Sequence, residues 1–307
     1  MDWLESILRR TIAQGTPLLL ATLGEIIAER SGIMNLGIEG MMSLGAVSGF
    51  IIAFQTGSPF LGMLMAIIIV AAFSALHAGV TVSLNSNQVI SGLALTMLGL
   101  GLSGLLGKPY IGKPLLLKMK AINIPLLGDI PFIGPILFNQ DLYFYLAVLL
   151  GIGAWIFLYK TRAGITVRSV GENPRAAESQ GINVRMVRYI CTAVGGAFAG
   201  LAGSQLSLSY SKSWIEGMTA GRGWIVIALT IFAMWDPRRA FAGAFLFGGI
   251  FVLQYPLQSI GISPNLLATL PYVTTLLALL LYSLSKAGRR KMSAPAMLGE
   301  PYRRDER

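Results

Sequence analysis

The sequence predicts an all-α fold, a polytopic membrane helix bundle with about nine transmembrane helices. Hydrophobic residues make up 54% of the 307 residues and charged residues only 12%, about half the share that soluble domains carry. Mean hydropathy is correspondingly high, at +0.66. From Gly40 to Gly107 the chain has no Asp, Glu, Lys or Arg, and this run is long enough for about three spans of roughly 20 residues each.

The charge-free runs set the expected order of the spans, with a total of about eight to ten. The predicted spans lie near residues 14–28, 33–54, 60–83, 88–107, 142–160, 186–208, 223–236, 240–257 and 266–284. Broken or re-entrant segments are expected near the N-terminus, because Gly24 to Met42 combines polar and flexible residues with the start of a hydrophobic run. At membrane depth such residues are tolerated where they face the bundle interior or a water-filled cavity.

Basic residues predict the orientation of the chain. Residues 160–188 include six basic and two acidic side chains, and the tail after Ser285 has seven basic and three acidic ones, so both segments are predicted to be cytoplasmic. The N-terminus then lies outside, where Arg9 and Arg10 are unfavourable. Two explanations stay open: an interfacial N-terminal segment, or a re-entrant first or second span. The expected regions are the interfacial segment 1–13, the transmembrane domain 14–285 with the cytoplasmic loop 161–185, and the basic cytoplasmic tail 286–307.

No motif in the sequence indicates catalysis. Cys191 is the single cysteine and cannot form a disulfide or a cysteine-rich metal site. For His77, the single histidine, we expect a hydrogen-bonded packing role, with a polar cavity role as the alternative. Gly107 to Pro114 fits a phosphate-binding loop except that Pro114 replaces the hydroxyl residue that would hold magnesium. The sequence therefore predicts no catalytic residue, no metal site, no bound cofactor and no enzymatic activity.

A short capped helix is predicted in the cytoplasmic loop. Asn173 can cap it, Pro174 suits its first position, and Gly181 can end it after about seven residues. The small face of Ala176 and Ala177 could enter a groove of a partner, and neighbouring Arg side chains could pair with an acidic surface. An ordinary solvated loop helix is the alternative. The residues expected in docking are Asn173, Pro174, Arg175, Ala176, Ala177, Glu178 and Gly181.

These segments resemble the permease subunits of ABC importers. Arg175-Ala-Ala-Glu-Ser-Gln-Gly181 is similar to their coupling-helix motif, which usually has Glu-Ala-Ala followed three residues later by Gly; here Arg175 stands in the place of the acid. Ser31-Gly-Ile-Met-Asn-Leu-Gly-Ile-Glu-Gly40 looks like the nucleoside-type members of the ribose, branched-chain amino acid and nucleoside branch. Met218–Gly223 and Ile130–Pro135 also look like them. The resemblance extends from about residue 14 to about residue 285.

The resemblance implies a transmembrane permease subunit of an ATP-driven importer, multi-pass in a bacterial or archaeal cytoplasmic membrane, that forms the path for a nucleoside or related sugar-containing solute. The implied partners are a second permease subunit, identical or homologous, two ATP-binding subunits that hold ATP and magnesium, and an extracytoplasmic substrate-binding protein or lipoprotein. Membrane lipid surrounds the chain, and nucleic acid is not an expected partner. The alternative is an ion- or proton-coupled secondary transporter. The scarcity of acidic residues in the spans after residue 40 disfavours that alternative.

Four polar residues are candidates for the substrate path: Asn35, Glu39, Asn87 and Gln88. An amide can both donate and accept hydrogen bonds, as the polar edge of a base or a ribose requires. Each candidate also has a structural alternative. Asn35 and Glu39 lie four residues apart on one helical face and could brace neighbouring backbone. Asn87 and Gln88 could terminate a helix at the inner surface.

Overall fold

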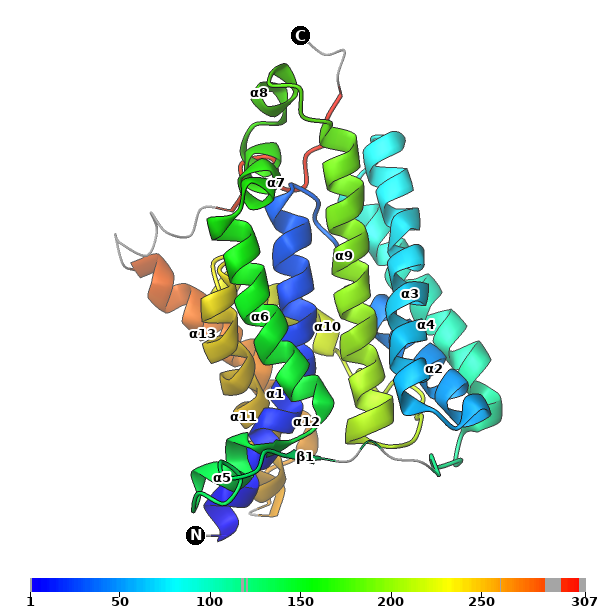
Figure 1. Cartoon of the computed structure of the whole chain (residues 1–307), viewed down its shortest axis with the longest axis vertical. Helices are drawn as coiled ribbons and strands as arrows, with labels where there is room; N and C mark the ends of the chain where they lie inside the picture. Colours follow the sequence, from blue (N-terminus) through cyan, green and yellow to red (C-terminus); the bar gives the residue numbers. More distant parts are fainter. Residues whose placement is uncertain (1, 117–118, 120, 260, 285–293, 304–307) are drawn as a thin grey trace.

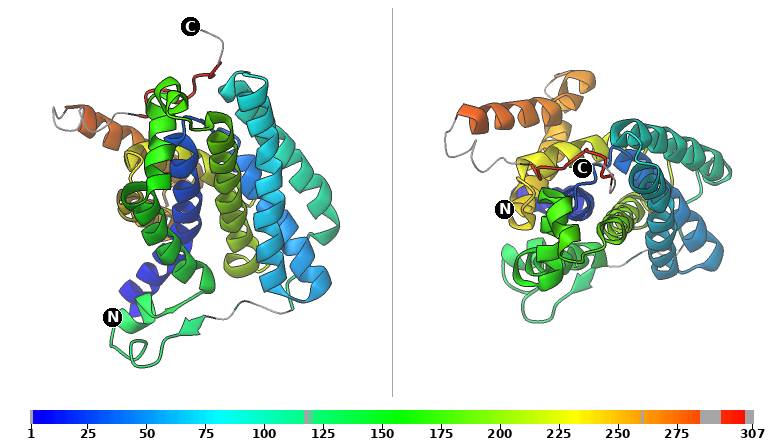
Figure 2. Two further views of the ribbon diagram at one scale, coloured as in Figure 1. Left: turned by 45° about the horizontal axis from the view of Figure 1, so that its top comes forward. Right: turned by 90° about the horizontal axis from the view of Figure 1, so that it is seen from above.

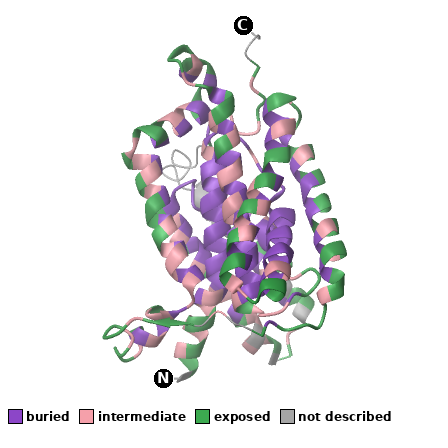
Figure 3. Cartoon of the chain, turned by 45° about the vertical axis from the view of Figure 1, so that its right-hand side comes forward, coloured by how far each residue is buried: buried purple, intermediate pink, exposed green. Residues whose placement is uncertain are grey.

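The computed structural model describes residues 2–116, 119, 121–259, 261–284 and 294–303. These residues form a bundle of helices that run roughly along one axis (Figure 1). Within the described residues, seven helices are long and apolar enough to cross a membrane, and two shorter apolar helices accompany them. The prediction of an all-α polytopic bundle is therefore confirmed. Buried positions concentrate on the central helices, whereas the outer helices alternate buried and exposed positions (Figure 3).

The long helices are α1 (Asp2–Arg30), α2 (Ile38–Thr56), α3 (Pro59–Ala78), α4 (Gln88–Gly107), α6 (Leu142–Lys160), α9 (Val184–Gln205) and α11 (Pro237–Ser259). The shorter helices are α5 (Ile133–Leu137), α7 (Arg162–Glu172), α8 (Pro174–Ser179), α10 (Arg222–Phe232), α12 (Pro264–Ala268) and α13 (Leu270–Leu284). A π-helical turn at Gly79–Ser83 extends α3, another at Leu206–Tyr210 extends α9, and a 3₁₀ turn at Lys108–Tyr110 follows α4. Strands β1 (Ile122–Asn123) and β2 (Asn139–Gln140) pair antiparallel in the loop before α6.

Helix α1 is the central element, because it contacts α6, α9, α10 and α11. It continues without a break from Asp2 to Arg30, although Pro17 lies inside it. The predicted interfacial segment 1–13 is thus helical from Asp2 onward and continuous with the first span. Its place relative to the membrane surface stays a prediction. The N-terminus lies at the end of the bundle opposite α8 (Figure 1).

Helices α2, α3, α4 and α9 pack closely through glycines. A Cβ added at Gly45 would lie 2.7 Å from the Gly200 Cα atom, and one added at Gly99 would lie 2.5 Å from the Gly40 carbonyl oxygen. A Cβ at Gly40 would in turn lie 2.6 Å from the Thr96 Cα atom. Small residues let helix backbones approach each other where no hydrophobic drive acts between helices in lipid. The glycines therefore fix α2 against the middle of α4 and against α9.

Two stretches of non-helical backbone interrupt the bundle. Residues 31–37 join α1 to α2, and residues 211–221 join the π turn after α9 to α10. The predicted span 33–54 thus begins as a helix only at Ile38, and the predicted span 223–236 ends as a helix at Phe232. The first interruption delays the start of α2, whereas α10 begins at Arg222 and ends before the predicted span does. This arrangement creates the candidate functional site.

Candidate functional site

The first turn of α10 is bound to the first turn of α2 through one acidic side chain. One carboxyl oxygen of Glu39 accepts hydrogen bonds from the Thr219 hydroxyl at 2.6 Å and from the Gly221 N–H at 3.0 Å. The other oxygen accepts from the Gly223 N–H at 2.6 Å. Glu39 is only 4% exposed. An acidic group is favoured at a helix N-terminus, because unpaired N–H groups and the helix dipole both attract it.

The contact between the two helices leaves no room for a side chain at Gly223. A Cβ there would lie 2.4 Å from the Glu39 Cα atom. Since Gly40 packs on Thr96 and Gly99, this crossing lies level with the middle of α4. The segment that follows α10 is anchored separately, because the Trp235 indole N–H donates to Glu29 near the end of α1. Helix α10 therefore runs from the middle of the bundle toward the end at which α1 finishes.

Arg222 fastens the same turn to α1. Its Nη2 donates to the Gln14 Oε1 at 2.9 Å, and its Nη1 donates to the Met218 and Thr219 carbonyl oxygens, each at 3.1 Å. The guanidinium also lies over the Phe251 ring, 5.0 Å from the ring centroid. A buried cation inside a membrane bundle needs such partners. The start of α10 is consequently tied to both α1 and α2.

The loop 31–37 is held at Met34. The Met34 N–H donates to the Gln88 Oε1 at 2.7 Å, and the Met34 carbonyl oxygen lies 3.0 Å from the His77 Nε2. The other ring nitrogen of His77 lies 2.9 Å from the Ser91 hydroxyl. Because a carbonyl accepts, Nε2 carries the proton and Nδ1 accepts from Ser91. His77 thus has the hydrogen-bonded packing role expected from the sequence, joining α3, α4 and the loop.

The structure brings two of the four path candidates to this loop. The Asn35 Oδ1 accepts from the Gly37 N–H at 3.0 Å, while its backbone N–H donates to Glu25 at 3.3 Å. Gln88 holds the neighbouring Met34, as described above. Asn87 instead caps α4 by accepting from the Ile90 N–H at 3.0 Å. Asn35 thus braces neighbouring backbone and Asn87 ends a helix, as their structural alternatives described, whereas the Gln88 side chain holds the loop. Their role in a path stays a prediction.

The segment 215–221, which was not among the path candidates, has the clearest features of a substrate path. Ile215, Glu216, Gly217 and Ala220 are exposed, although they lie in the non-helical segment that leads down to the α10 start. A Cβ added at Gly104 of α4 would lie 3.2 Å from the Glu216 Oε1, which places Glu216 beside the last turns of α4. The sequence signal was present, because two glycines and several polar residues between positions 211 and 221 interrupt an apolar region.

The short capped helix that the sequence predicts for docking is present as α8. Asn173 caps α8 by accepting from the Ala176 N–H at 3.0 Å, Pro174 occupies its first turn, and Gly181 follows it with φ +81°. One expectation needs correction, because Ala177 is only 4% exposed and packs in a cluster with Val170, Val184 and Tyr302.

The exposed surface of the docking helix is formed instead by other residues of the predicted set. Arg175 and Ala176 are exposed and Glu178 is half-buried. Pro174 is buried, as Ala177 is. The surface available to a partner is therefore narrower and more basic than an Ala-Ala face. The docking role of these residues stays a prediction.

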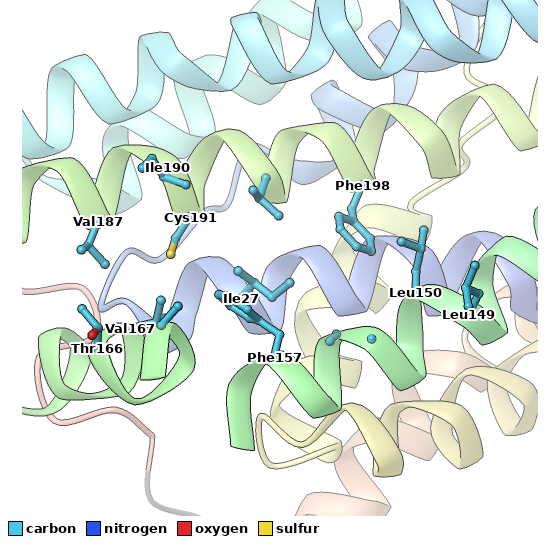
Figure 4. A pocket seen from close by; sticks show the side chains of 14 residues that line it. Ile27, Leu149, Leu150, Phe157, Thr166, Val167, Val187, Ile190, Cys191 and Phe198 are labelled. Carbon is cyan, nitrogen blue, oxygen red and sulfur yellow. The ribbon is translucent and has the colours of Figure 1, made fainter. Parts of the chain in front are cut away.

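A large apolar groove lies elsewhere, between α6 and α9 and below α7 (Figure 4). Its volume is about 720 Å³. The lining residues are Ile27, Leu149, Leu150, Gly153, Ala154, Phe157, Ala163, Thr166, Val167, Val187, Ile190, Cys191, Val194 and Phe198. The hydroxyl of Thr166 is already bonded to the Arg162 carbonyl oxygen. A groove with so few polar groups offers a polar solute no orienting contacts.

The fold and these sites define a multi-pass membrane transport subunit. The chain belongs to the family of branched-chain amino acid transport system permease components, whose family model matches residues 7–282. It is thus a permease subunit of an ABC transporter and not an enzyme. The resemblance inferred from Ser31–Gly40 and Arg175–Gly181 is confirmed.

Several relatives are similar over nearly the whole chain. A Haloferax volcanii protein named for glucose transport, the ABC transporter permease protein TsgC13, is 37% identical over 99% of both chains. The guanosine ABC transporter permease protein NupQ of Bacillus subtilis is 34% identical over 99% of this chain and 98% of its own. The nucleoside ABC transporter permease protein NupC of Lactococcus lactis is 35% identical over 92% and 93%.

Bacillus subtilis has a second, more distant relative for the same solute. Its guanosine ABC transporter permease protein NupP is 26% identical over 81% of this chain and 74% of its own. One organism thus has two different permease chains named for guanosine, and this chain is more similar to one of them. No solved structure matches the chain.

Proposed function

We propose that this permease forms one half of the translocation path for a nucleoside or a related sugar-containing solute. Two similar relatives are named for guanosine and for nucleosides, and a third is named for glucose. The chemistry that these solutes share is a polar, hydroxyl-rich sugar ring. The comparisons support the ABC permease function and give no support to the coupled secondary transporter considered above.

One observation carries the location of the path. The backbone of residues 215–221 is not helical, lies within the depth of the bundle, and exposes Ile215, Glu216 and Ala220. Irregular backbone does not face lipid within the hydrocarbon region, because its polar groups would have no partners there. This face must therefore be covered by protein or line a water-filled path. A path between two permease subunits satisfies both conditions.

The Glu39 contact restricts how the path opens. Because Glu39 binds three donors of the Thr219 to Gly223 turn, α2 and the start of α10 move as one unit. Rocking of this unit then changes the access to residues 215–221 from one side of the membrane or the other. Movement would enter at α8, which is the cytoplasmic surface that the ATP-binding subunit pushes.

The assembly that we propose has four kinds of subunit. Two ATP-binding subunits hold ATP and magnesium and dock on the cytoplasmic helices, and a substrate-binding protein or lipoprotein delivers the solute outside. The second permease is a homologue of this chain, because the two Bacillus subtilis guanosine permeases differ in their similarity to it. The setting is the cytoplasmic membrane of a bacterium or archaeon, since the relatives come from both.

The proposed function is tested by purifying the tagged protein from its native host in mild detergent. We expect an ATP-binding subunit and a second, different permease to copurify. Reconstituted vesicles should take up radiolabelled guanosine or glucose only when ATP is supplied. Uptake that responds to an uncoupler while ATP is held constant, or a lone chain after crosslinking, would contradict the proposal.

Docking at α8 has its own test. Replacing the exposed Ala176 by Asp puts a negative charge on the docking surface, whereas Ala176→Ser changes its size and charge very little. We expect Ala176→Asp to abolish uptake while membrane insertion stays normal, and Ala176→Ser to be active. Ala177→Asp is not a clean test, because it would bury a charge against Val170 and Val184.

A further inference from the structure

The described part of the C-terminal tail, Ala294–Arg303, lies across the end of the bundle that carries α8 (Figure 1; Figure 2, red). We call it the C-terminal strap. It contacts the loop 161–185 at several points. The Met297 N–H donates to the Gly171 carbonyl oxygen at 3.0 Å, and the Ala296 N–H donates to the Glu172 carboxyl at 3.3 Å. These bonds fasten the strap to the end of α7.

The strap also reaches α8 itself. The Tyr302 hydroxyl donates to the Glu178 carboxyl, and the Tyr302 ring packs on the cluster that includes Ala177. Ala177 is the small residue that the sequence placed on the docking face. Its burial therefore has a cause: the inward face of α8 is covered partly by the chain's own C-terminus. A displacement of α8 must therefore either move Tyr302 or break its contacts with Glu178 and Ala177.

The other contacts of the strap lie at the loop that precedes α2. The Gly299 N–H donates to the Gly32 carbonyl oxygen at 3.4 Å. The Gln88 Nε2 donates to the Glu300 carbonyl oxygen at 3.4 Å, while the Oε1 of the same amide holds Met34. Gln88 thus bridges the strap and the loop through one side chain. The individual bonds are long, but they all join the same two segments.

Arg188 of α9 lies beneath the strap and is only 1% exposed. Its Nη1 donates to the Glu300 carbonyl oxygen at 3.5 Å, and its guanidinium lies 5.9 Å from the Tyr302 ring centroid. Among the described residues, its Nε and Nη2 atoms have no hydrogen-bond partner. A buried cation is costly without partners, so the strap supplies much of what stabilises this guanidinium.

The loop is shaped to fit against the strap. Gly32 adopts φ +90°, a conformation that favours glycine, and a Cβ there would lie 3.2 Å from the Met297 carbonyl oxygen and 2.9 Å from Arg188. The left-handed residue and the passing strap are therefore compatible only because position 32 has no side chain. This close fit indicates a specific contact between the loop 31–37 and the C-terminal strap.

We propose that the C-terminal strap transmits the movement of α8 to the loop 31–37, and through it to α2 and the Glu39 contact. The proposal rests on the proposed function, because it takes α8 as the site where ATP-driven movement enters. It adds a direct link between the coupling helix and the start of α2, supplied by the chain's own C-terminus. The strap is then a coupling element and not a docking surface.

The test compares the full-length complex with a variant that ends at Ser293. We expect the ATP-binding subunit to remain bound and basal ATP hydrolysis to remain within about 2-fold. ATP-driven uptake, and the stimulation of hydrolysis by solute and its binding protein, should fall by about 5-fold or more, the lower end of typical coupling between sites. Tyr302→Phe, which keeps the ring and removes only the bond to Glu178, should show a smaller loss of the same kind.

Glu300→Ala is the matched control, because the strap uses the carbonyl oxygen of Glu300 and its side chain is exposed. It should leave uptake unchanged. Unchanged uptake in both the truncated and the Tyr302→Phe variants would overturn the inference. Loss of the ATP-binding subunit on truncation would overturn it as well, because the strap would then be a docking surface. Absence of that subunit from the unmodified protein would overturn the proposed function and this inference together.

Discussion

Helices α8 and α10 are both short, yet they begin in opposite ways. Helix α8 is capped by its own preceding residue, Asn173, which accepts from the Ala176 N–H. Helix α10 is preceded by Gly221, which has no side chain for the purpose, and its first N–H groups bind Glu39 from the first turn of α2. A locally capped helix can form and move by itself. A helix capped by another helix moves with it.

The difference fits the two proposed roles. Helix α8 lies at the end of the bundle opposite the N-terminus, where an independent unit can follow a docked partner. Helix α10 starts at the middle of the bundle, where unpaired N–H groups are costly and a partner from elsewhere in the chain must satisfy them. Four substitutions test this difference between the two helices, and their expected effects decrease from Glu39 to Asp236.

Glu39→Gln should have the largest effect. The amide group of Gln would present donors where Gly223 or Thr219 also donates, so at least one buried donor loses its acceptor. We expect a loss of about 2 kcal/mol or more in stability. The measurement is the apparent Tm of the purified complex at a fixed scan rate. Glu216→Gln, at an exposed acid, should leave the Tm unchanged; equal shifts in the two variants would show that α10 does not depend on Glu39.

Gly223→Ala should have the second-largest effect. The added Cβ would lie 2.4 Å from the Glu39 Cα atom, so α10 must shift away from α2 at a cost of about 1–3 kcal/mol. Uptake should fall with the Tm, because the two helices no longer move together. Gly101→Ala in α4 is the control, since a Cβ there has nothing within 4 Å. A normal Tm and normal uptake for Gly223→Ala would contradict the close crossing.

Asn173→Ala should have a local effect. Loss of the cap costs about 1 kcal/mol, enough to fray a helix of six residues without changing the apparent Tm of the bundle. Hydrogen exchange of the α8 amides should become faster, and uptake should decrease while the ATP-binding subunit remains bound. Asn173→Asp keeps an oxygen at the same place and should restore slow exchange. A lowered Tm would show that α8 is not the independent unit described here.

The smallest effect is expected at Asp236, between α10 and α11. Burial would raise the pKa of this carboxyl, but hydrogen bonds from Arg238, at 2.9 Å and 3.2 Å to its side chain, outweigh burial and hold the pKa below its ordinary value. A lowered pKa adds stability that is present above the ordinary Asp pKa of about 3.9 and is lost as the pH falls through the lowered value. Asp236→Asn should remove this part of the acid sensitivity of the Tm. If the Tm of Asp236→Asn and that of the unmodified protein fell equally at low pH, this contribution of Asp236 would be contradicted.

Most of the bundle could be predicted from the sequence, because its signals are local. Charge-free runs marked the spans, and the Asn173, Pro174 and Gly181 pattern marked α8 with its cap. The family was recognisable from Ser31–Gly40 for the same reason, since the motif is contiguous. Each of these features depends on residues that lie within a few positions of one another.

The features that could not be predicted depend on contacts between distant residues. Nothing near Gly221 indicates that Glu39, 182 positions earlier, would accept its N–H. Burial of Ala177 depends on Tyr302 at the other end of the chain, so an exposed face was expected instead. The exposure of Ile215, Glu216 and Ala220 depends on how α10 packs. The same limit explains why the path candidates at Asn35 and Gln88 could not be separated from bracing residues.

A water-filled path at residues 215–221 is tested by labelling a cysteine introduced at Ala220, in a background where the buried Cys191 is replaced by Ala. Leu149→Cys, which is 66% exposed on α6 beside the apolar groove, is the matched control. In proteoliposomes a membrane-impermeant maleimide should label position 220, transported solute should protect that position, and position 149 should stay unlabelled. Equal labelling of both positions, or none at 220 with and without ATP, would contradict a water-filled path at this face.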